Sequence, residues 1–161
     1  MRRPAPAVRL LAIAAIISFG GSAGAQDTDR DAVVARVRQV FEGFLARDSA
    51  KIASAFLPSA ILVTLTDSTP ARERVMTVEQ IAARFAHATG EPMTERIFDP
   101  VVHIDGPAAQ VWAYFTVHTG KVFSRCGTDA VTLLKVYGEW KITHFMFVRD
   151  VGPCTHSEPL P

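Results

Sequence analysis

Four segments rich in β-branched and aromatic residues follow one another in the second half of the chain, and they constrain the fold more than any other feature. They cover residues 93–104, 109–118, 122–136 and 140–148. Short turns that contain glycine separate them at the spacing of β-hairpins. Strands joined by such turns pair in an antiparallel way. The second half of the chain is therefore predicted to form a four-stranded meander.

Helical patterns precede the meander. Residues 29–46 carry apolar side chains at helical spacing, which predicts an amphipathic helix. Asp48 is suited to cap a short second helix, and Thr77 with Gln80 forms a capping box that opens a third. Between these helices, residues 60–66 have the composition of a strand. The order predicts an α+β domain, with N-terminal helices packed on a strongly curved, mostly antiparallel sheet.

The N-terminal segment has the pattern of an export signal. A positively charged start precedes an apolar run, and Ala23 and Ala25 occupy the positions that a signal peptidase reads. Cleavage after Ala25 is predicted, and it would leave residues 26–161, with a core at 28–151 and a loose tail at 152–161. The run is shorter than the roughly 20 residues of a membrane-spanning helix, so no membrane association is expected after cleavage. A membrane anchor is the alternative.

The charge balance excludes partners that need a strongly basic surface. The chain has 161 residues, with 17 Lys and Arg against 16 Asp and Glu. Removal of the signal takes away three arginines and no acid, which makes the exported domain mildly acidic. No nucleic-acid partner is therefore expected. Hydrophobic residues make up 48% of the chain, which suits one packed core and excludes a disordered protein.

The expected state of the two cysteines depends on whether the protein is exported. The protein is expected in the periplasm, an oxidising compartment, where Cys126 and Cys154 are expected to form an intrachain disulfide. The predicted hairpin register places Cys126 opposite Val151, and Gly152-Pro153 supplies the bend that would bring Cys154 back. Two free thiols, one of them used between chains, are the alternative. No zinc-ligand spacing and no nucleotide-binding motif is present, so no metal or cofactor is expected.

The last hairpin predicts which side chains share one face of the sheet. If Gly138-Glu139 is a two-residue turn, Tyr137 lies opposite Trp140, and opposed residues share a face. A similar turn at Gly120-Lys121 extends that face to the preceding strand, although one extra residue would reverse the assignment. The face so defined is mainly apolar and is assigned to the concave side: Trp112, Tyr114, His118, Asp129, Val131, Leu133, Trp140, Ile142, His144, Met146 and Val148.

The order of the elements, together with three short stretches, resembles a known superfamily. The stretches are VWA at 111–113, CGTDA at 126–130 and EWKI at 139–142. They are similar to the nuclear-transport-factor-2-like (NTF2-like) superfamily, which includes SnoaL-like polyketide cyclases and ketosteroid isomerases. The resemblance covers about residues 28–154 and extends to exported members that end in a lone cysteine, here Cys154. It implies a cone with an internal pocket, usually in a dimer, and no single activity.

Six residues of the predicted concave face are expected to line the pocket: Trp112, Tyr114, Asp129, Leu133, His144 and Met146. A carboxyl group facing an apolar cavity would have a raised pKa, so Asp129 is a candidate proton acceptor. His144 is a second candidate base, and Tyr114 is a candidate donor. Each candidate base has an alternative role without chemistry. His144 would be a hydrogen-bonded residue of the core, and Asp129 would satisfy backbone donors or pair with Arg125 or Arg149. The opposite face, with Leu134, Phe145 and Phe147, is expected to form a homodimer.

Two classes of function follow. The first is an exported binding or accessory protein that holds a small apolar or aromatic molecule without chemistry. It is preferred, because no complete acid–base set can be matched to the enzymes of the superfamily. The second is a cofactor-independent isomerase, cyclase or hydrolase that uses Asp129 or His144 as its general base. Two polar groups close enough to share one substrate would favour the enzyme.

Overall fold

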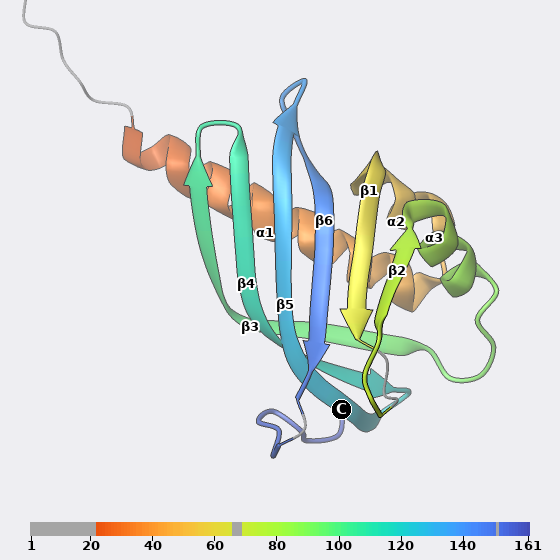
Figure 1. The fold of residues 1–161 in the computed structure, drawn as a ribbon. Helices are drawn as coiled ribbons and strands as arrows, with labels where there is room; N and C mark the ends of the chain where they lie inside the picture. Colours follow the sequence, from red (N-terminus) through yellow and green to blue (C-terminus); the bar gives the residue numbers. More distant parts are fainter. Residues whose placement is uncertain (1–21, 66–68, 151) are drawn as a thin grey trace, which may run out of the picture.

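A long helix lies across one face of a curved six-stranded sheet in the computed structural model, which describes residues 22–65, 69–150 and 152–161 (Figure 1). The helices are α1 (Ser22–Ala46), α2 (Ser49–Ser54) and α3 (Val78–Ala86), and the strands are β1 (Phe56–Leu65), β2 (Glu73–Thr77), β3 (Met93–Asp105), β4 (Ala108–Thr119), β5 (Val122–Val136) and β6 (Glu139–Arg149). The strand order is β2-β1-β6-β5-β4-β3, and only β1 and β6 pair in parallel. The predicted α+β fold is confirmed.

Two of the predicted helix starts are confirmed. The side chain of Asp48 accepts a hydrogen bond of 2.9 Å from the amide of Lys51 at the start of α2. At α3 the Thr77 hydroxyl accepts from the amide of Gln80 at 3.2 Å, and the Gln80 side chain accepts from the amide of Thr77 at 3.0 Å. This capping box begins α3 directly at the end of β2, so the helix packs beside the edge of the sheet.

The sequence pattern does not predict β2. This strand has five residues at the edge of the sheet, and most of its side chains are exposed. A short, charged edge strand lacks the alternation of buried and exposed residues by which a strand is recognised.

The last hairpin turns one residue earlier than predicted. Tyr137 and Gly138 form the turn with φ of 50° and 82°, the positive values that a two-residue type I′ turn needs. Val136 therefore pairs with Glu139 at the end of the hairpin. Further along β6, Thr143 is an extra residue that forms a β-bulge. The predicted register of this hairpin is wrong.

The bulge reverses the faces in the second half of β6. Phe145 and Phe147 lie on the concave side, where Phe145 is buried in the core and Phe147 packs against it. His144 and Met146 lie on the outer, convex face. The prediction that His144 and Met146 share the concave face is therefore wrong. The prediction that Phe145 and Phe147 form an outer dimer surface is wrong for the same reason.

A second bulge shifts β5 against β4. The Gly120-Lys121 turn forms as predicted, but Ser124 is an extra residue in β5. Beyond it, Asp129 lies opposite Ala113 rather than Trp112, so Trp112 lies on the outer face together with Tyr114, two residues along the strand. The prediction that Trp112 and Tyr114 line the pocket is therefore wrong. One extra residue in β5 reverses the faces, and the alternation of side chains in the sequence does not reveal it.

The core lies between α1 and the concave face of the sheet. Its buried apolar residues include Val33, Val37, Val40, Phe41, Phe44, Val111, Ala113, Val131, Leu133, Trp140, Ile142 and Phe145. In the N-terminal half of α1 the Asp29 carboxylate accepts hydrogen bonds from Lys135 Nζ at 2.6 Å and Trp140 Nε1 at 3.2 Å. These bonds hold the pKa of Asp29 below its usual value. The helix is thereby fixed across β5 and β6.

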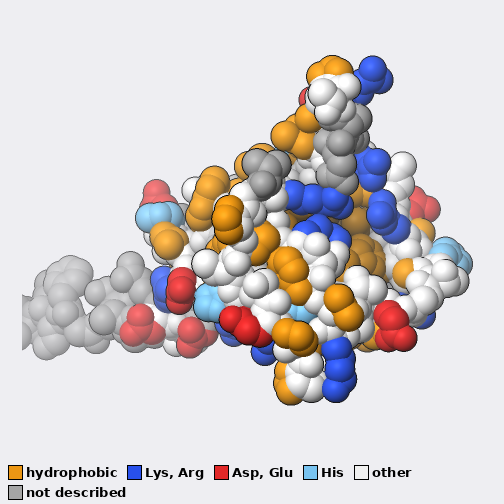
Figure 2. Space-filling model, turned by 90° about the horizontal axis from the view of Figure 1, so that it is seen from below, with side chains coloured by type: hydrophobic (Ala, Val, Ile, Leu, Met, Phe, Trp, Pro, Cys, Tyr) orange, Lys and Arg blue, Asp and Glu red, His pale blue; other side chains and the backbone are white. Residues whose placement is uncertain are grey.

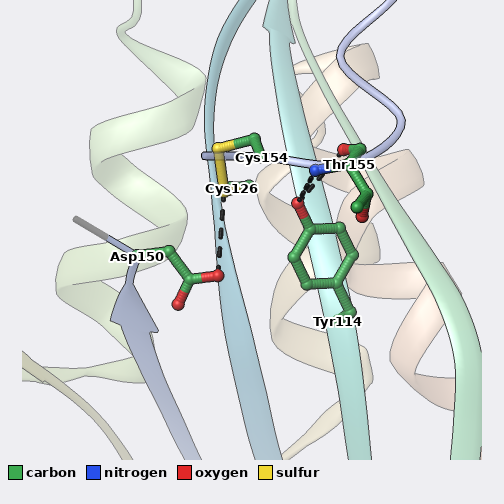
Figure 3. Close-up of a disulfide and its surroundings, with 5 residues drawn as sticks. All are labelled: Tyr114, Cys126, Asp150, Cys154 and Thr155. Carbon is green, nitrogen blue, oxygen red and sulfur yellow. Dashed lines mark hydrogen bonds between the residues drawn. A yellow bond between two sulfur atoms is a disulfide. The ribbon is translucent and has the colours of Figure 1, made fainter. Parts of the chain in front are cut away.

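The C-terminal tail is fastened to the outer face of the sheet (Figure 3). Cys126 and Cys154 form a disulfide with their Cα atoms 5.9 Å apart, so the predicted pairing is confirmed. The amide of Thr155 donates to the Tyr114 hydroxyl at 2.9 Å, and that hydroxyl donates to the Thr155 carbonyl at 3.1 Å. The ring of His156 stacks on Phe98 with centroids 4.0 Å apart. The tail, expected to be loose, is therefore held at several points.

The predicted export signal lies almost entirely outside the described residues. The residue predicted to lie opposite Cys126, Val151, is also outside the described residues. Its neighbour Asp150 donates a backbone hydrogen bond to the carbonyl oxygen of Cys126. In the part of the chain that the structure describes, no helix has the length and apolar character needed to cross a membrane.

Candidate functional site

A cavity of about 110 Å³ opens between α3, β1 and the curled ends of β3 to β6. Figure 2 looks at the molecule from below and shows a hollow where hydrophobic and basic side chains gather. Most of the described lining is apolar, and these residues come from five of the six strands and from two of the helices: Phe44, Leu62, Leu65, Met76, Ile81, Phe85, Met93, Phe115, Val117, Phe145 and Phe147. Apolar walls of this kind are typical of small-molecule sites.

Two local features of the sequence shape these walls. The Thr143 bulge turns Phe145 and Phe147 into the cavity. Gly127 makes room for Phe115, because a Cβ atom at this position would lie 2.8 Å from two carbon atoms of the Phe115 ring. It would also collide with the carbonyl oxygen of Val148. Glycine is therefore required where the Phe115 ring crosses β5.

Among the described residues, five charged side chains line the same cavity, and four of them are arginines. The arginines come from four different elements: Arg74 from β2, Arg84 from α3, Arg125 from β5 and Arg149 from β6. Among the described lining residues the single acid is Glu95 of β3. Positive charge is thus concentrated here, although the chain as a whole has 17 basic and 16 acidic residues.

Glu95 and Arg125 lie on the same face of the sheet, because both pair with Val117 of the strand between them. Burial raises the pKa of Glu95 to about 7, and the positive charge of Arg125 opposes this rise. A carboxyl group with such a pKa exchanges its proton near neutral pH. Glu95 can therefore be charged or neutral under ordinary conditions.

Asp129 lies on the concave face, between Ala113 and Phe147 of the neighbouring strands. It is fully buried, and within the described residues neither of its carboxyl oxygens has a hydrogen-bond partner. Burial first, and the negative charge of Glu95 second, raise the pKa of Asp129 well above its usual value. Asp129 is not among the residues that line the cavity.

The other predicted pocket residues are divided between the two faces. Leu133 is buried in the core on the concave side. Trp112, His144 and Met146 lie on the outer face, where 52% of Trp112 is exposed. Tyr114 is on the outer face as well, bound to the tail. The structure therefore separates Asp129 from His144 and Tyr114 by the thickness of the sheet.

The sequence pattern predicts neither Glu95 nor any of the four arginines as a pocket residue; Arg125 and Arg149 are expected only as alternative partners of Asp129. Each comes from a different element, so no spacing in the sequence connects them. One signal was available: Arg125, Gly127 and Asp129 alternate along β5 beyond the bulge, which places Arg125 on the same face as Asp129. Among the described residues, no group of three or more His, Cys, Asp or Glu side chains is placed to hold a metal ion.

The fold is that of the NTF2-like proteins. A protein of unknown function from Mycobacterium tuberculosis is similar, with a TM-score of 0.68, 15% identity, and 83% of this chain and 78% of that chain covered. An NTF2-like protein with a cystatin-like fold from Novosphingobium aromaticivorans has a TM-score of 0.67 and 12% identity, covering 80% and 86%. A "putative dehydratase from the NTF2-like family" of Streptomyces avermitilis has a TM-score of 0.60 and 14% identity, covering 79% and 99%. At these identities the likeness concerns the fold alone.

The family follows from the sequence itself. The chain belongs to the family described as "Putative lumazine-binding", whose sequence model matches residues 28–148. This family is a member of the NTF2-like superfamily, so the resemblance identified from the sequence is confirmed. No curated protein matches the chain.

Proposed function

We propose that this chain is an exported protein that binds a small molecule with an apolar or aromatic body in the cavity of the cone. The observation that carries the proposal is the cavity itself, whose walls are mainly Phe, Leu, Ile, Val and Met side chains. Burial of apolar ligand surface against such walls favours binding by about 25 cal/mol for each Å². The description of the family as "Putative lumazine-binding" supports a small-molecule ligand.

The size of the cavity limits the ligand. An engineered apolar cavity of about 150 Å³ holds one benzene molecule. The enclosed part of this site, about 110 Å³, therefore suits a body of about one ring. A larger ligand would have to extend through the open mouth toward solvent.

Two observations support export. The sequence before Gln26 has the pattern of a cleavable signal. The Cys126–Cys154 disulfide is of the kind that persists in oxidising compartments such as the bacterial periplasm. The ligand would then be bound outside the cytoplasm.

Native mass spectrometry of protein isolated from its own periplasm tests the proposal. We expect an added mass that disappears on denaturation and is absent from a Met76→Trp variant, because Met76 lines the cavity and a larger side chain would fill it. Glu73→Trp is the matched control, since Glu73 lies on the same edge strand, is exposed and does not line the cavity. An adduct that survives in Met76→Trp would contradict this assignment of the site.

Asp129 favours a second candidate function, a cofactor-independent isomerase, cyclase or hydrolase. It is a buried carboxyl group without hydrogen-bond partners among the described residues, on the concave side of the sheet. In this proposal Asp129 is the proton acceptor, and the half-buried Glu95 is close enough to raise its pKa. His144 does not take part, because it lies on the outer face.

The outer face of the sheet supports a homodimer, but Phe145 and Phe147, which the sequence predicts to form its interface, do not lie on this face. One apolar row crosses all six strands through paired residues: Val75, Val63, Met146, Ala130, Trp112 and Val101. The adjacent row is polar apart from Ile61 and contains no Lys, Arg, Asp or Glu: Thr77, Ile61, His144, Thr132, Gln110 and His103. A two-fold contact places the same patch against itself, so a surface free of like charges suits it.

We expect Trp112→Glu to convert the dimer into monomers. Trp112 lies within the apolar row with half of its surface exposed, and central aromatic residues of interfaces contribute roughly 2 to 4 kcal/mol to association. The dissociation constant should rise at least about 30-fold, measured by sedimentation equilibrium. Leu45→Glu is the control, because Leu45 is similarly exposed on α1 and outside the row. Wild-type protein that is monomeric at micromolar concentration would contradict the dimer.

A further inference from the structure

The cavity described above has a second property, a strong excess of positive charge. Among the described residues, four guanidinium groups and one carboxyl group surround a space whose other walls are apolar except for Thr64. A guanidinium group keeps its charge at all ordinary pH values. Charges beside a water-poor, apolar volume interact more strongly with an ion bound there than they would in bulk water.

Arg84 and Arg74 are at the open side of the cavity. Arg84 comes from the last turn of α3 and Arg74 from the edge strand β2, and both residues are exposed. Within the described residues neither of them makes an ion pair. Arg125 lies further in and is partly buried. The positive groups thus extend from the rim to the wall.

The one acid of the cavity does not balance the arginines. Glu95 is a single carboxyl group against four guanidinium groups, and burial shifts it toward its neutral form near pH 7. The charge of the described lining is therefore between three and four positive units at neutral pH. A neutral ligand would leave Arg74 and Arg84 without an ion-pair partner among the described residues.

We propose that the ligand is a small organic anion, with an apolar body of about one ring in the cavity and a carboxylate directed to the arginines at its mouth. This inference rests on the proposed function and names the ligand class of the same site. The planar guanidinium fork matches a carboxylate in a bidentate way, and such charge-assisted bonds are the stronger ones in proteins. Arg84 and Arg74 are the residues assigned to the carboxylate.

A comparison of benzoate with benzamide tests the ligand class, because the two probes have the same ring and differ in charge. By isothermal titration calorimetry at pH 6 and low salt, we expect benzoate to bind at least about tenfold more tightly. Arg84→Gln should weaken benzoate about tenfold and benzamide less than about twofold, and Arg74→Gln should act in the same direction. Arg96→Gln is the control, since Arg96 is exposed on β3 and does not line the cavity. It should change neither affinity.

Salt and pH give independent readouts. Raising NaCl should weaken benzoate and leave benzamide unchanged, because salt screens charges. Benzoate should bind more tightly below pH 7 than above it, since Glu95 is then neutral. Glu95→Gln should remove this pH dependence. The Glu95→Gln variant leaves the other charged and titratable groups around this position in place: Arg38 and Glu42 on α1, Arg74 on β2, Arg84 on α3, Arg125 and Asp129 on β5, and Arg149 on β6.

The outcomes separate the two proposals. Equal binding of benzoate and benzamide, with no effect of Arg84→Gln or Arg74→Gln, would overturn the anion inference and leave the proposed binding function intact. Tighter binding of benzamide would do the same. If neither probe binds at millimolar concentration and no adduct accompanies the periplasmic protein, the proposed function fails together with the inference.

Discussion

Replacement of Cys154 with serine is expected to lower the free energy of unfolding by about 3 to 4 kcal/mol. The disulfide joins residues that are 28 positions apart in the sequence. A link over this distance lowers the conformational entropy of the unfolded chain, which stabilises the folded state by about 3 to 4 kcal/mol. For a domain of this size the loss corresponds to a decrease in melting temperature of roughly 10 °C. Thermal unfolding followed by circular dichroism measures it.

The control for this variant is the wild-type protein treated with a reductant, which should show the same decrease. Ser157→Ala, in the exposed part of the tail, should show none. Iodoacetamide should label neither cysteine of the folded wild-type protein before reduction. An unchanged melting temperature in Cys154→Ser would show that the rest of the tail is sufficient to hold the outer face.

Loss of the disulfide should also weaken the contacts between the C-terminal tail and the outer face of the sheet. His118 and Thr116 are almost fully buried on the outer face of β4, and Nε2 of His118 is bonded to the carbonyl oxygen of Glu158 at 2.9 Å. The disulfide positions the residues that make these contacts. In Cys154→Ser we therefore also expect limited proteolysis to remove residues 152–161, which should be protected in the wild type.

The parts of the fold that could be predicted are those with a strong local pattern. Glycine-containing turns and long β-rich segments identify the meander, and the Thr77–Gln80 capping box identifies the start of α3. The edge strand β2 lacks such a pattern, because its side chains are mostly exposed. The pairing of Cys126 with Cys154 could be predicted from their number and the expected compartment.

The faces of the sheet could not be predicted beyond the two bulges. In β6 the residues Met146, Phe147 and Val148 are all apolar, so alternation does not reveal which of them faces the core. The extra residues Thr143 and Ser124 have no signature of their own in the sequence. The predicted face is therefore correct for Asp129 and wrong for His144 and Met146, which follow the Thr143 bulge. The cavity arginines come together only through the topology.

Replacement of Asp129 with asparagine is expected to change the pH dependence of stability. The folded protein retains the proton of Asp129 at pH values where the unfolded chain releases it, because burial raises the pKa of this carboxyl group above its ordinary value of 3.8. The free energy of unfolding of the wild type should therefore fall as the pH rises through the interval between the two pKa values. The slope attributable to Asp129 is at most about 1.4 kcal/mol for each pH unit. Asparagine does not ionise, so the variant should lack this decline.

Urea unfolding of both proteins between pH 4 and pH 9 measures the difference. Glu95 contributes a decline of its own between 4.5 and about 7, so the comparison is best made in a Glu95→Gln background. Asp105→Asn is the control, since Asp105 is exposed at a hairpin. Parallel curves for Asp129→Asn and its parent would show that the folded and unfolded pKa values of Asp129 are equal.

The pH at which the free energy of unfolding of the wild type stops falling relative to Asp129→Asn distinguishes the two proposed functions. A general base must be ionised at the pH at which the protein works, and its pKa is best placed near that pH. If the stability advantage of Asp129→Asn stops growing below pH 7, Asp129 is ionised at neutral pH and can accept a proton, as the enzyme proposal requires. If the advantage continues to grow above pH 7, Asp129 is a neutral acid at working pH. It can then donate a hydrogen bond but cannot act as a base, which leaves ligand binding as the function that the cavity supports.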